Sequence, residues 1–253
     1  MENFKNKTVL ITGGSGGIGT ATAKEFLLLG ANVMLVDINK EALKKTVSDL
    51  STDKVAFVTA DVRDDEQVKN YVDKTLQTFG SIDVFFNNAG IEGEVKPLDQ
   101  YSLDVFNRVI DVNIRGVYLG LRHVFPAMKK NGGSIIITSS VAGLSGTAHV
   151  LPYVTSKHAV IGMMRTAALE GAPYNIRVNT VNPSPVNNRM MRSLEAGFAP
   201  EDATGAQKNF EAGIPLGRYA SNQDVTNMVV FLASENSSFI TGSVYSVDGG
   251  MTA

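Results

Sequence analysis

The sequence predicts an α/β fold in a single domain, with a doubly wound, seven-stranded parallel sheet and helices on both faces. Short apolar runs alternate with helical segments along the chain, which is the order that parallel strands with helical crossovers require. The first apolar run ends in a glycine-rich loop that leads into a helix. The 253 residues are 43% hydrophobic, enough for one large core. We therefore expect one domain over residues 1–253.

Seven segments are strand candidates because they are short and several are almost entirely apolar, as strands covered on both faces should be. They are residues 7–11, 32–36, 54–60, 84–87, 134–139, 177–182 and 244–247. Long helices are predicted at about 103–130 and 152–173. Residues 183–217 are rich in glycine, proline and asparagine and too long for a simple turn, so they are our candidate substrate lid.

Composition excludes several classes of function. The net charge is only −2, so no basic field would attract nucleic acid or anionic lipid. There is no cysteine, and the three histidines are scattered without metal-ligand spacing, so we expect neither thiol nor metal chemistry. The longest apolar runs are strand-sized and residues 1–5 lack a hydrophobic signal region. We expect a cytoplasmic protein with no membrane partner.

The glycine loop at residues 12–19 reads Thr-Gly-Gly-Ser-Gly-Gly-Ile-Gly and lies between a predicted strand and a predicted helix. Glycines let the backbone approach a phosphate, and a helix that begins near Ile18 presents free N–H groups and its positive dipole end to a pyrophosphate. A flexible surface turn is the alternative, but such turns lie in polar linkers. The candidate cofactor-binding residues in this loop are Gly13, Ser15, Gly16, Gly17, Ile18 and Gly19.

Asp37 ends the second apolar run, 18 residues after Gly19, close to the ~20 expected for an acid that binds the ribose of a dinucleotide. Its carboxylate should accept hydrogen bonds from the adenosine hydroxyls. The same charge would repel a 2′-phosphate, and Gly16 offers no compensating cation, so we predict NAD(H) rather than NADP(H). The alternative is that Asp37 merely starts a turn.

Tyr153 and Lys157 are four residues apart on a predicted helix, so their side chains share one face. A neighbouring ammonium favours the phenolate and should bring the ionisation of the tyrosine, normally near pH ~10, closer to neutral pH. The pair then forms a base that can take a proton from an alcohol. The alternative is an ordinary helix with a solvated lysine.

In order and spacing, the motifs of this chain resemble the short-chain dehydrogenase/reductase family over essentially its whole length. The matching segments are the glycine loop, Asp61-Val62, Asn87-Asn88-Ala89-Gly90, Asn113, Ser140 with Tyr153 and Lys157, and the segment that contains Pro183. Ser140 precedes Tyr153 by 13 residues, the usual interval in this family, so we prefer it to Ser139. The resemblance implies a Rossmann fold.

The resemblance also assigns cofactor contacts. It implies that Asp61 and Val62 face the adenine, that Asn88, Ala89 and Gly90 line the cofactor, and that Val186 lies near the nicotinamide carboxamide. Asp61 and Asn88 could instead be turn residues that satisfy local hydrogen bonds.

One segment departs from the family pattern of Pro-Gly followed by threonine, because this chain reads Pro183-Ser184-Pro185-Val186-Asn187-Asn188. Asn188 still offers amide donors and an acceptor to the carboxamide, while Pro185 stiffens the backbone that enters the candidate lid. We therefore expect Pro183, Val186 and Asn188 to contribute to cofactor binding.

The mechanism that we infer has Ser140 and Tyr153 hold the oxygen of an alcohol while Tyr153 takes its proton and the carbon gives hydride to the cofactor. In reverse, Tyr153 acts as the acid that reduces a ketone. By resemblance, Lys157 also holds the nicotinamide ribose and Asn113 positions a water that links Lys157 to solvent. A buried asparagine that satisfies backbone groups is the alternative for Asn113.

The leading hypothesis is an NAD-dependent secondary alcohol dehydrogenase or ketone reductase for small or medium, mostly uncharged substrates. A 3-ketoacyl thioester reductase that uses NADPH and a carrier is an alternative within the same family. A dinucleotide-binding regulator without catalysis is a third possibility, although the set Asn113, Ser140, Tyr153 and Lys157 is complete. By resemblance, the two long helices would pair with symmetry mates in a homotetramer.

Overall fold

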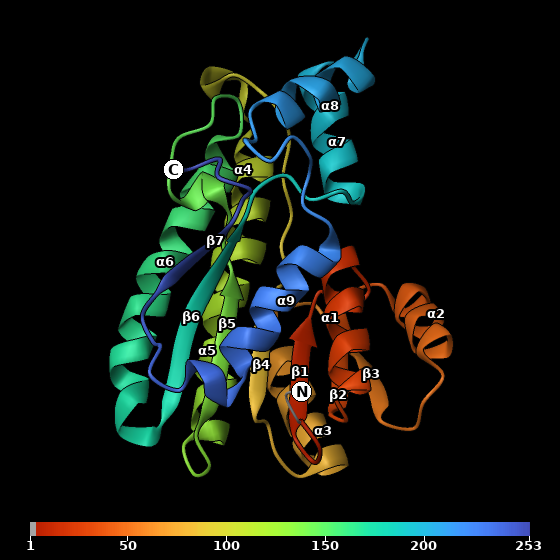
Figure 1. Cartoon of the computed structure of the whole chain (residues 1–253), viewed down its shortest axis with the longest axis vertical. Coiled ribbons are helices and arrows are strands. Elements are labelled where there is room, and N and C mark those ends of the chain that lie inside the picture. The colour runs from red at the N-terminus through yellow and green to blue at the C-terminus, as the bar shows by residue number, and fades with distance from the viewer. Residues whose placement is uncertain (1–3) are drawn as a thin grey trace.

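The computed structural model describes residues 4–253 and confirms the predicted α/β class (Figure 1). Residues 1–3 lie outside the described part, and the expectation that residues 1–5 lack a hydrophobic signal region falls mostly on them. In residues 4–253 the sheet has seven strands, all parallel, in the order β3-β2-β1-β4-β5-β6-β7. The strands are β1 Thr8–Thr12, β2 Asn32–Asp37, β3 Val55–Thr59, β4 Val84–Asn87, β5 Gly133–Thr138, β6 Ile176–Pro183 and β7 Val244–Val247.

The order of the strands reverses between β1 and β4. The chain first proceeds outward from β1 to β3, then returns to β4 on the other side of β1 and proceeds outward to β7. In a doubly wound sheet, ligands bind beyond the carboxyl ends of the strands at this reversal. The segments that follow β1 and β4 therefore border the expected cleft.

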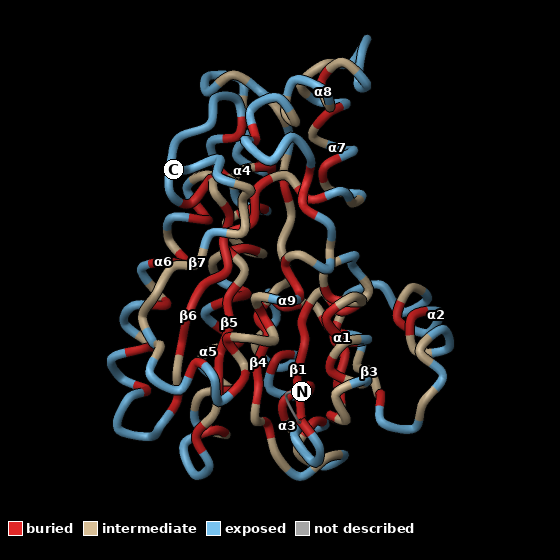
Figure 2. The backbone as a smooth tube through the Cα atoms, viewed as in Figure 1, coloured by how far each residue is buried: buried red, intermediate tan, exposed pale blue. Residues whose placement is uncertain are grey.

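Helices cover both faces of the sheet and form two separate cores. On one face lie α1 (Gly17–Leu28), α2 (Lys40–Leu50) and α9 (Asn222–Ala233); on the other lie α3 (Asp65–Phe79), α5 (Gly116–Met128) and α6 (Leu151–Gly171). Along β1, Ile11 joins the first core and Leu10 the second, as the alternation of strand side chains requires. The central strands are accordingly buried along their length (Figure 2).

The first of the two predicted long helices contains an irregular turn. Helix α4 (Leu103–Ile110) continues into α5 through one π-helical turn at Asp111–Arg115. Such turns widen the helix by one residue and are frequent at functional sites. Here the turn carries Asn113, which is buried.

The candidate lid is largely helical, which the sequence analysis did not predict. It contains α7 (Arg189–Phe198) and α8 (Ala203–Ala212), which Figure 1 shows beyond the carboxyl ends of the strands. Their apolar side chains form a small cluster with Met191, Ile214 and Tyr219, apart from the two main cores. Short 3₁₀ turns complete the fold at Leu98–Gln100, Val141–Gly143, Ala172–Tyr174 and Glu235–Ser237. None of the helices in residues 4–253 is long and apolar enough to cross a bilayer.

Candidate active site

The glycine loop joins β1 to α1 and leaves no room for a side chain at Gly19. Gly13 has a φ of +65°, and a Cβ on Gly19 would lie 2.2 Å from the carbonyl oxygen of Gly13. Gly16 precedes α1 and provides no side-chain cap. The first N–H groups of α1 thus lack a side-chain acceptor, and together with the helix dipole they form a place for an anion at the strand reversal.

Asp37 lies at the end of β2 and contacts the glycine loop. Its Oδ2 accepts hydrogen bonds from the backbone N–H of Ser15 at 3.2 Å and from the Ser15 hydroxyl at 2.6 Å. Its Oδ1 accepts from the N–H of Asn39 at 3.2 Å, a local turn contact. The carboxylate therefore faces the loop as well as its own turn, and its oxygens have lone pairs left for a ligand.

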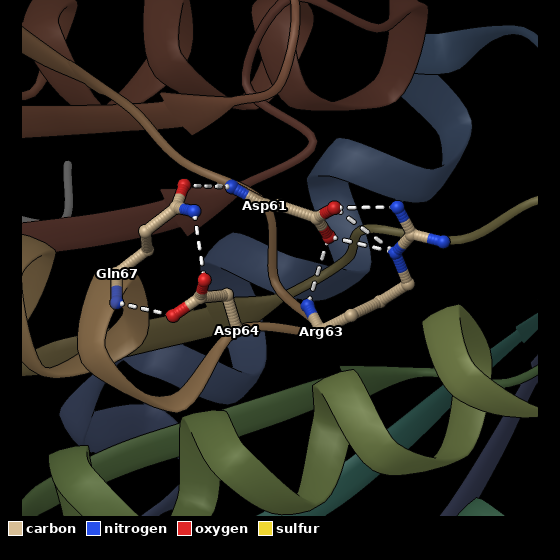
Figure 3. A network of polar contacts seen from close by, with 4 residues as sticks. All are labelled: Asp61, Arg63, Asp64 and Gln67. Carbon is tan, nitrogen blue, oxygen red and sulfur yellow. Dashed lines mark hydrogen bonds and ion pairs between the residues drawn. The ribbon is translucent and has the colours of Figure 1, made fainter.

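Asp61 sits in a local polar network after β3 (Figure 3). Its Oδ2 pairs with Nη2 of Arg63 at 2.6 Å, which holds the pKa of Asp61 below its usual value. Its backbone N–H donates to Gln67. Every contact of the Asp61 side chain in the described residues is with Arg63, in keeping with the turn alternative, and its contact with adenine remains a prediction. The next residue, Val62, is buried against Gly116.

Thr12, whose side chain the sequence analysis did not single out, fastens β1 to the segment after β4. Its hydroxyl accepts from the backbone N–H of Asn88 at 2.9 Å and of Ala89 at 3.1 Å. The Asn88 amide donates to the Thr12 carbonyl at 3.2 Å and accepts from the Thr138 hydroxyl at 2.9 Å. Asn88 therefore joins three strand ends, and Asn88, Ala89 and Gly90 border the same cleft as the glycine loop.

Ser140, Tyr153 and Lys157 come together beyond the end of β5. The Ser140 hydroxyl donates to the Pro183 carbonyl at 3.4 Å and accepts from the Ala142 N–H at 3.2 Å, and its interaction with the Tyr153 side chain lowers the pKa of that phenol. Ser139 instead donates to the carbonyl of Lys157 at 2.8 Å, so its hydroxyl points back into α6. Of the two serines, Ser140 is the one that affects the pKa of the tyrosine, and its catalytic role remains a prediction.

Burial dominates the ionisation of the tyrosine and the lysine. It raises the pKa of Tyr153 to about 12, against the lowering effect of the Ser140 hydroxyl and with a further increase from the charge of Glu92. Burial also lowers the pKa of Lys157 to about 8. The expected lowering of the Tyr153 pKa by Lys157 is therefore wrong for this structure, because desolvation penalises the charged form of both groups.

Lys157 is buried, with its Nζ 5.4 Å from the centre of the Tyr153 ring. The ammonium donates to the Thr138 carbonyl at 2.9 Å. This excludes the alternative of a solvated lysine on an ordinary helix, because the charge lies inside the protein at the end of β5.

Asn113 fastens the backbone of the segment that follows Gly90. Its Oδ1 accepts from the N–H of Ile91 at 2.8 Å, and its Nδ2 donates to the carbonyl of Ile91 at 2.9 Å and to the Ser156 hydroxyl at 3.0 Å. These contacts agree with the second hypothesis for Asn113, that of a buried asparagine that satisfies backbone groups. Its positioning of a water near Lys157 remains a prediction. A Cβ on Gly90 would lie 3.3 Å from Asn113 Oδ1 and 3.5 Å from Lys157 Nζ, so both polar groups border the same small space.

The segment that departs from the family pattern runs from β6 into α7. Pro183 and Val186 are buried, and Val186 pairs with Ala220 as an isolated parallel bridge. Asn188 is the N-cap of α7, where its side-chain oxygen accepts from the N–H of Met191 at 3.3 Å. One lone pair of this oxygen is therefore used, and the second lone pair and the amide N–H groups remain for a cofactor.

The sequence analysis missed an ion pair between the segment after β4 and α7. Glu92, two residues after Gly90, is buried, and its carboxylate pairs with both terminal nitrogens of Arg189 at 3.1 and 3.3 Å. The two residues lie 97 positions apart. Apart from Glu92 following the Asn88–Gly90 motif, the sequence contains no signal that would pair them. Among residues 4–253 no cluster of histidines and carboxylates could hold a metal ion.

Comparison with known proteins establishes the family. The sequence model of a family described as enoyl-(acyl carrier protein) reductase matches residues 13–252. Levodione reductase from Leifsonia aquatica is 37% identical, with 99% of this chain and 96% of the relative covered. Cyclohexanol dehydrogenase from Acinetobacter sp. (strain SE19) is also 37% identical, over 100% and 98%.

The chain belongs to the short-chain dehydrogenase/reductase family. Solved structures of the family agree with the fold. An NAD⁺-bound xylitol dehydrogenase is 34% identical with a TM-score of 0.91, over 98% of this chain and 99% of that one. A 3-ketoacyl-(acyl-carrier-protein) reductase from Brucella melitensis, complexed with NADH, is 30% identical with a TM-score of 0.92, over 99% and 100%.

Membership of the short-chain dehydrogenase/reductase family confirms the predicted class of activity. The protein is an oxidoreductase that transfers hydride between a nicotinamide dinucleotide and an alcohol or ketone. The identities of the cofactor-binding and catalytic residues remain predictions, and the geometry above is the basis for the proposals that follow.

Proposed function

We propose that this protein is an NAD(H)-dependent secondary alcohol dehydrogenase or ketone reductase in which Tyr153 is the acid and base. The observation that carries the proposal is the convergence of the Ser140 hydroxyl, the Tyr153 phenol and the buried Lys157 ammonium beyond β5, beside the cleft of the glycine loop. Two hydroxyls that can hold one substrate oxygen, next to a buried cation, provide what proton transfer to or from an alcohol requires.

The residues of the cleft fit a dinucleotide. A Cβ on Gly13 or Gly19 would meet other atoms of the fold at 3.0 Å or less, so glycine is needed for this tight turn, and α1 begins without a side-chain cap. Backbone N–H groups can therefore bind the pyrophosphate. Asp37 would accept from the adenosine ribose while its charge repels a 2′-phosphate, which supports NAD(H) over NADP(H). The bound nicotinamide supplies the hydride acceptor or donor.

Each residue of the catalytic group has a distinct role in the proposal. The Ser140 hydroxyl orients the substrate oxygen next to Tyr153, which takes the proton in oxidation and returns it in reduction. Lys157, charged below its pKa of about 8, stabilises the phenolate that forms after oxidation begins and would hold the nicotinamide ribose. Asn113 keeps the segment after Gly90 in place, and its carbonyl borders the space shared with the Lys157 ammonium.

A spectrophotometric screen tests the proposal. Absorbance of the reduced cofactor would be followed with secondary alcohols, diols, ketones and ketoacyl thioesters, with NAD(H) and NADP(H) in parallel. Tyr153→Phe should lower kcat by about 10²- to 10⁴-fold, the usual contribution of a positioned acid or base, while NADH binding changes little. Retention of most of the wild-type rate in Tyr153→Phe would show that another group transfers the proton.

A 3-ketoacyl thioester reductase remains the second candidate. The structure of a relative with that activity is complexed with NADH, so use of NADH alone does not distinguish the two functions, contrary to what the sequence analysis assumed. The substrate panel does: a kcat/KM for a ketoacyl thioester well above those for simple ketones would favour the second candidate.

We also infer a homotetramer in the cytoplasm. Leu103 on α4, Tyr118 on α5 and Leu169 on α6 are large apolar side chains exposed on the two long helices, as an interface between copies would require. Sedimentation equilibrium at micromolar concentration tests the assembly, and cell fractionation tests the location. A monomer would remove the interface but leave the site unchanged.

A further inference from the structure

Glu92 is held in a fixed position in the segment that follows β4, two residues after Gly90. Asn113 binds both the N–H and the carbonyl of the preceding residue, Ile91. The following residue, Gly93, has a φ of +77°, and a Cβ there would lie 2.8 Å from a methyl group of Val109. The backbone on both sides of Glu92 is therefore constrained, as in a preorganised binding residue.

The carboxylate of Glu92 has only one partner in the described residues. Its side chain is 8% exposed, whereas that of Arg189, which donates to both oxygens, is 75% exposed. An ion pair with a largely solvated arginine contributes little to stability, while burial of a carboxylate is costly without enough donors. Stability of the fold therefore does not account for this residue.

Acceptor capacity remains on Glu92. A carboxylate has about four lone-pair sites, and Arg189 occupies one on each oxygen. Glu92 is two residues after Gly90, where a Cβ would lie 3.5 Å from Lys157 Nζ, so the carboxylate is carried by the segment next to the catalytic lysine. Its charge also contributes to raising the pKa of Tyr153. A second polar group of a substrate held at Tyr153 is therefore a donor that these remaining lone pairs can accept from.

We propose that Glu92 determines substrate specificity by accepting a hydrogen bond from a second hydroxyl group of the substrate, so that diols and hydroxyketones are preferred. The inference rests on the proposed function and narrows its substrate class. Because the Arg189 guanidinium already balances the charge of the carboxylate, the additional donor is a neutral hydroxyl rather than an ammonium group.

The test compares kcat/KM for cyclohexanol, the three positional isomers of cyclohexanediol and 2-aminocyclohexanol. The quantity of interest is the ratio of the best diol to cyclohexanol. Glu92→Met, which keeps the side-chain length but removes the charged acceptor, should reduce this ratio about 10- to 100-fold, the range for a hydrogen bond to a charged group. Glu92→Gln should lie between Glu92→Met and the wild type.

Arg189→Gln is the matched variant, because it breaks the ion pair and leaves the carboxylate in place. We expect it to retain the diol ratio within about threefold. NADH binding, followed by fluorescence, shows whether each variant is folded.

Three results would overturn the inference. They are an equal loss on diol and cyclohexanol in Glu92→Met, a loss of the ratio in Arg189→Gln as large as in Glu92→Met, and a wild-type preference for 2-aminocyclohexanol. In these cases the proposed function stands. A wild-type enzyme that oxidises no alcohol and reduces no ketone would instead refute the proposed function and this inference together.

Discussion

Replacement of Asp37 by asparagine should remove most of the preference for NAD(H) over NADP(H). The variant keeps the size of the side chain and an oxygen that can accept from Ser15, whose hydroxyl lies 2.6 Å from Asp37 in this structure. It removes the negative charge at the end of β2, where a 2′-phosphate would lie. The glycine loop should therefore keep its shape while the repulsion disappears.

The expected magnitude follows from the charge. Two unit charges about 4 Å apart in a partly exposed site repel by about 4 kcal/mol. That energy corresponds to a preference of about 10³-fold, since each 1.4 kcal/mol is a factor of ten. Asp37→Asn should therefore reduce the ratio of kcat/KM for NAD⁺ to that for NADP⁺ by about 10²- to 10³-fold.

Steady-state kinetics with each cofactor at fixed alcohol concentration measures this ratio, and Asp61→Asn is the matched control. Asp61 also follows a strand in the same half of the sheet, but the resemblance places it at the adenine, which both cofactors share. It should affect NAD⁺ and NADP⁺ equally. A change of less than tenfold in Asp37→Asn, or an equal change in Asp61→Asn, would show that the charge of Asp37 does not select the cofactor.

Three further predictions concern ionisation and packing. Burial lowers the pKa of Lys157 from 10.5 to about 8. Below pH 8 the folded protein therefore bears the cost of a buried charge, and its stability rises with pH between about 8 and 10.5. In calorimetric scans at pH 7, Lys157→Met should unfold at a higher temperature than the wild type, and the difference in melting temperature should shrink as the pH rises from 8 to 10.5. Tyr153, with a pKa of about 12, is almost entirely protonated at neutral pH, so alcohol oxidation should accelerate from pH 6 to 8 while ketone reduction should not. The increase should level off above pH 8, where Lys157 loses the charge that stabilises the phenolate, and an oxidation rate independent of pH would exclude the phenolate as base. Gly19→Ala places a Cβ 2.2 Å from the Gly13 carbonyl and should abolish NADH binding and lower the melting temperature, whereas Gly162→Ala on α6, where no atom lies within 4 Å of the new Cβ, should lower neither.

Local features of the fold were predictable from the sequence because they depend on residues close together in the chain. The strand candidates match the observed strands to within about two residues at each end. Tyr153 and Lys157 share a helix face, and Ser140 is distinguished from Ser139 by its spacing. The helices α7 and α8 were missed because their segment is rich in glycine, proline and asparagine, while the contacts that stabilise them are tertiary.

Contacts between distant segments could not be predicted in the same way. The hydrogen bonds of Thr12 to Asn88 and the ion pair of Glu92 with Arg189 depend on which strands are neighbours and on where α7 packs. The predicted direction of the Tyr153 pKa was wrong for a related reason. Its direction is set mainly by desolvation, and the degree of burial of a side chain is a property of the whole fold.

The separate apolar cluster of α7 and α8 has a consequence for how the substrate side of the molecule can vary. Because Met191, Ile214 and Tyr219 pack with one another outside the two main cores, side chains of α7 and α8 can be replaced without opening the interior of the sheet. The segment remains tied to the rest of the chain by the Glu92–Arg189 pair and by the hydrogen bond from the Leu216 N–H to the Gly249 carbonyl. New substrates can therefore be accommodated by sequence change in these two helices while the sheet keeps its shape.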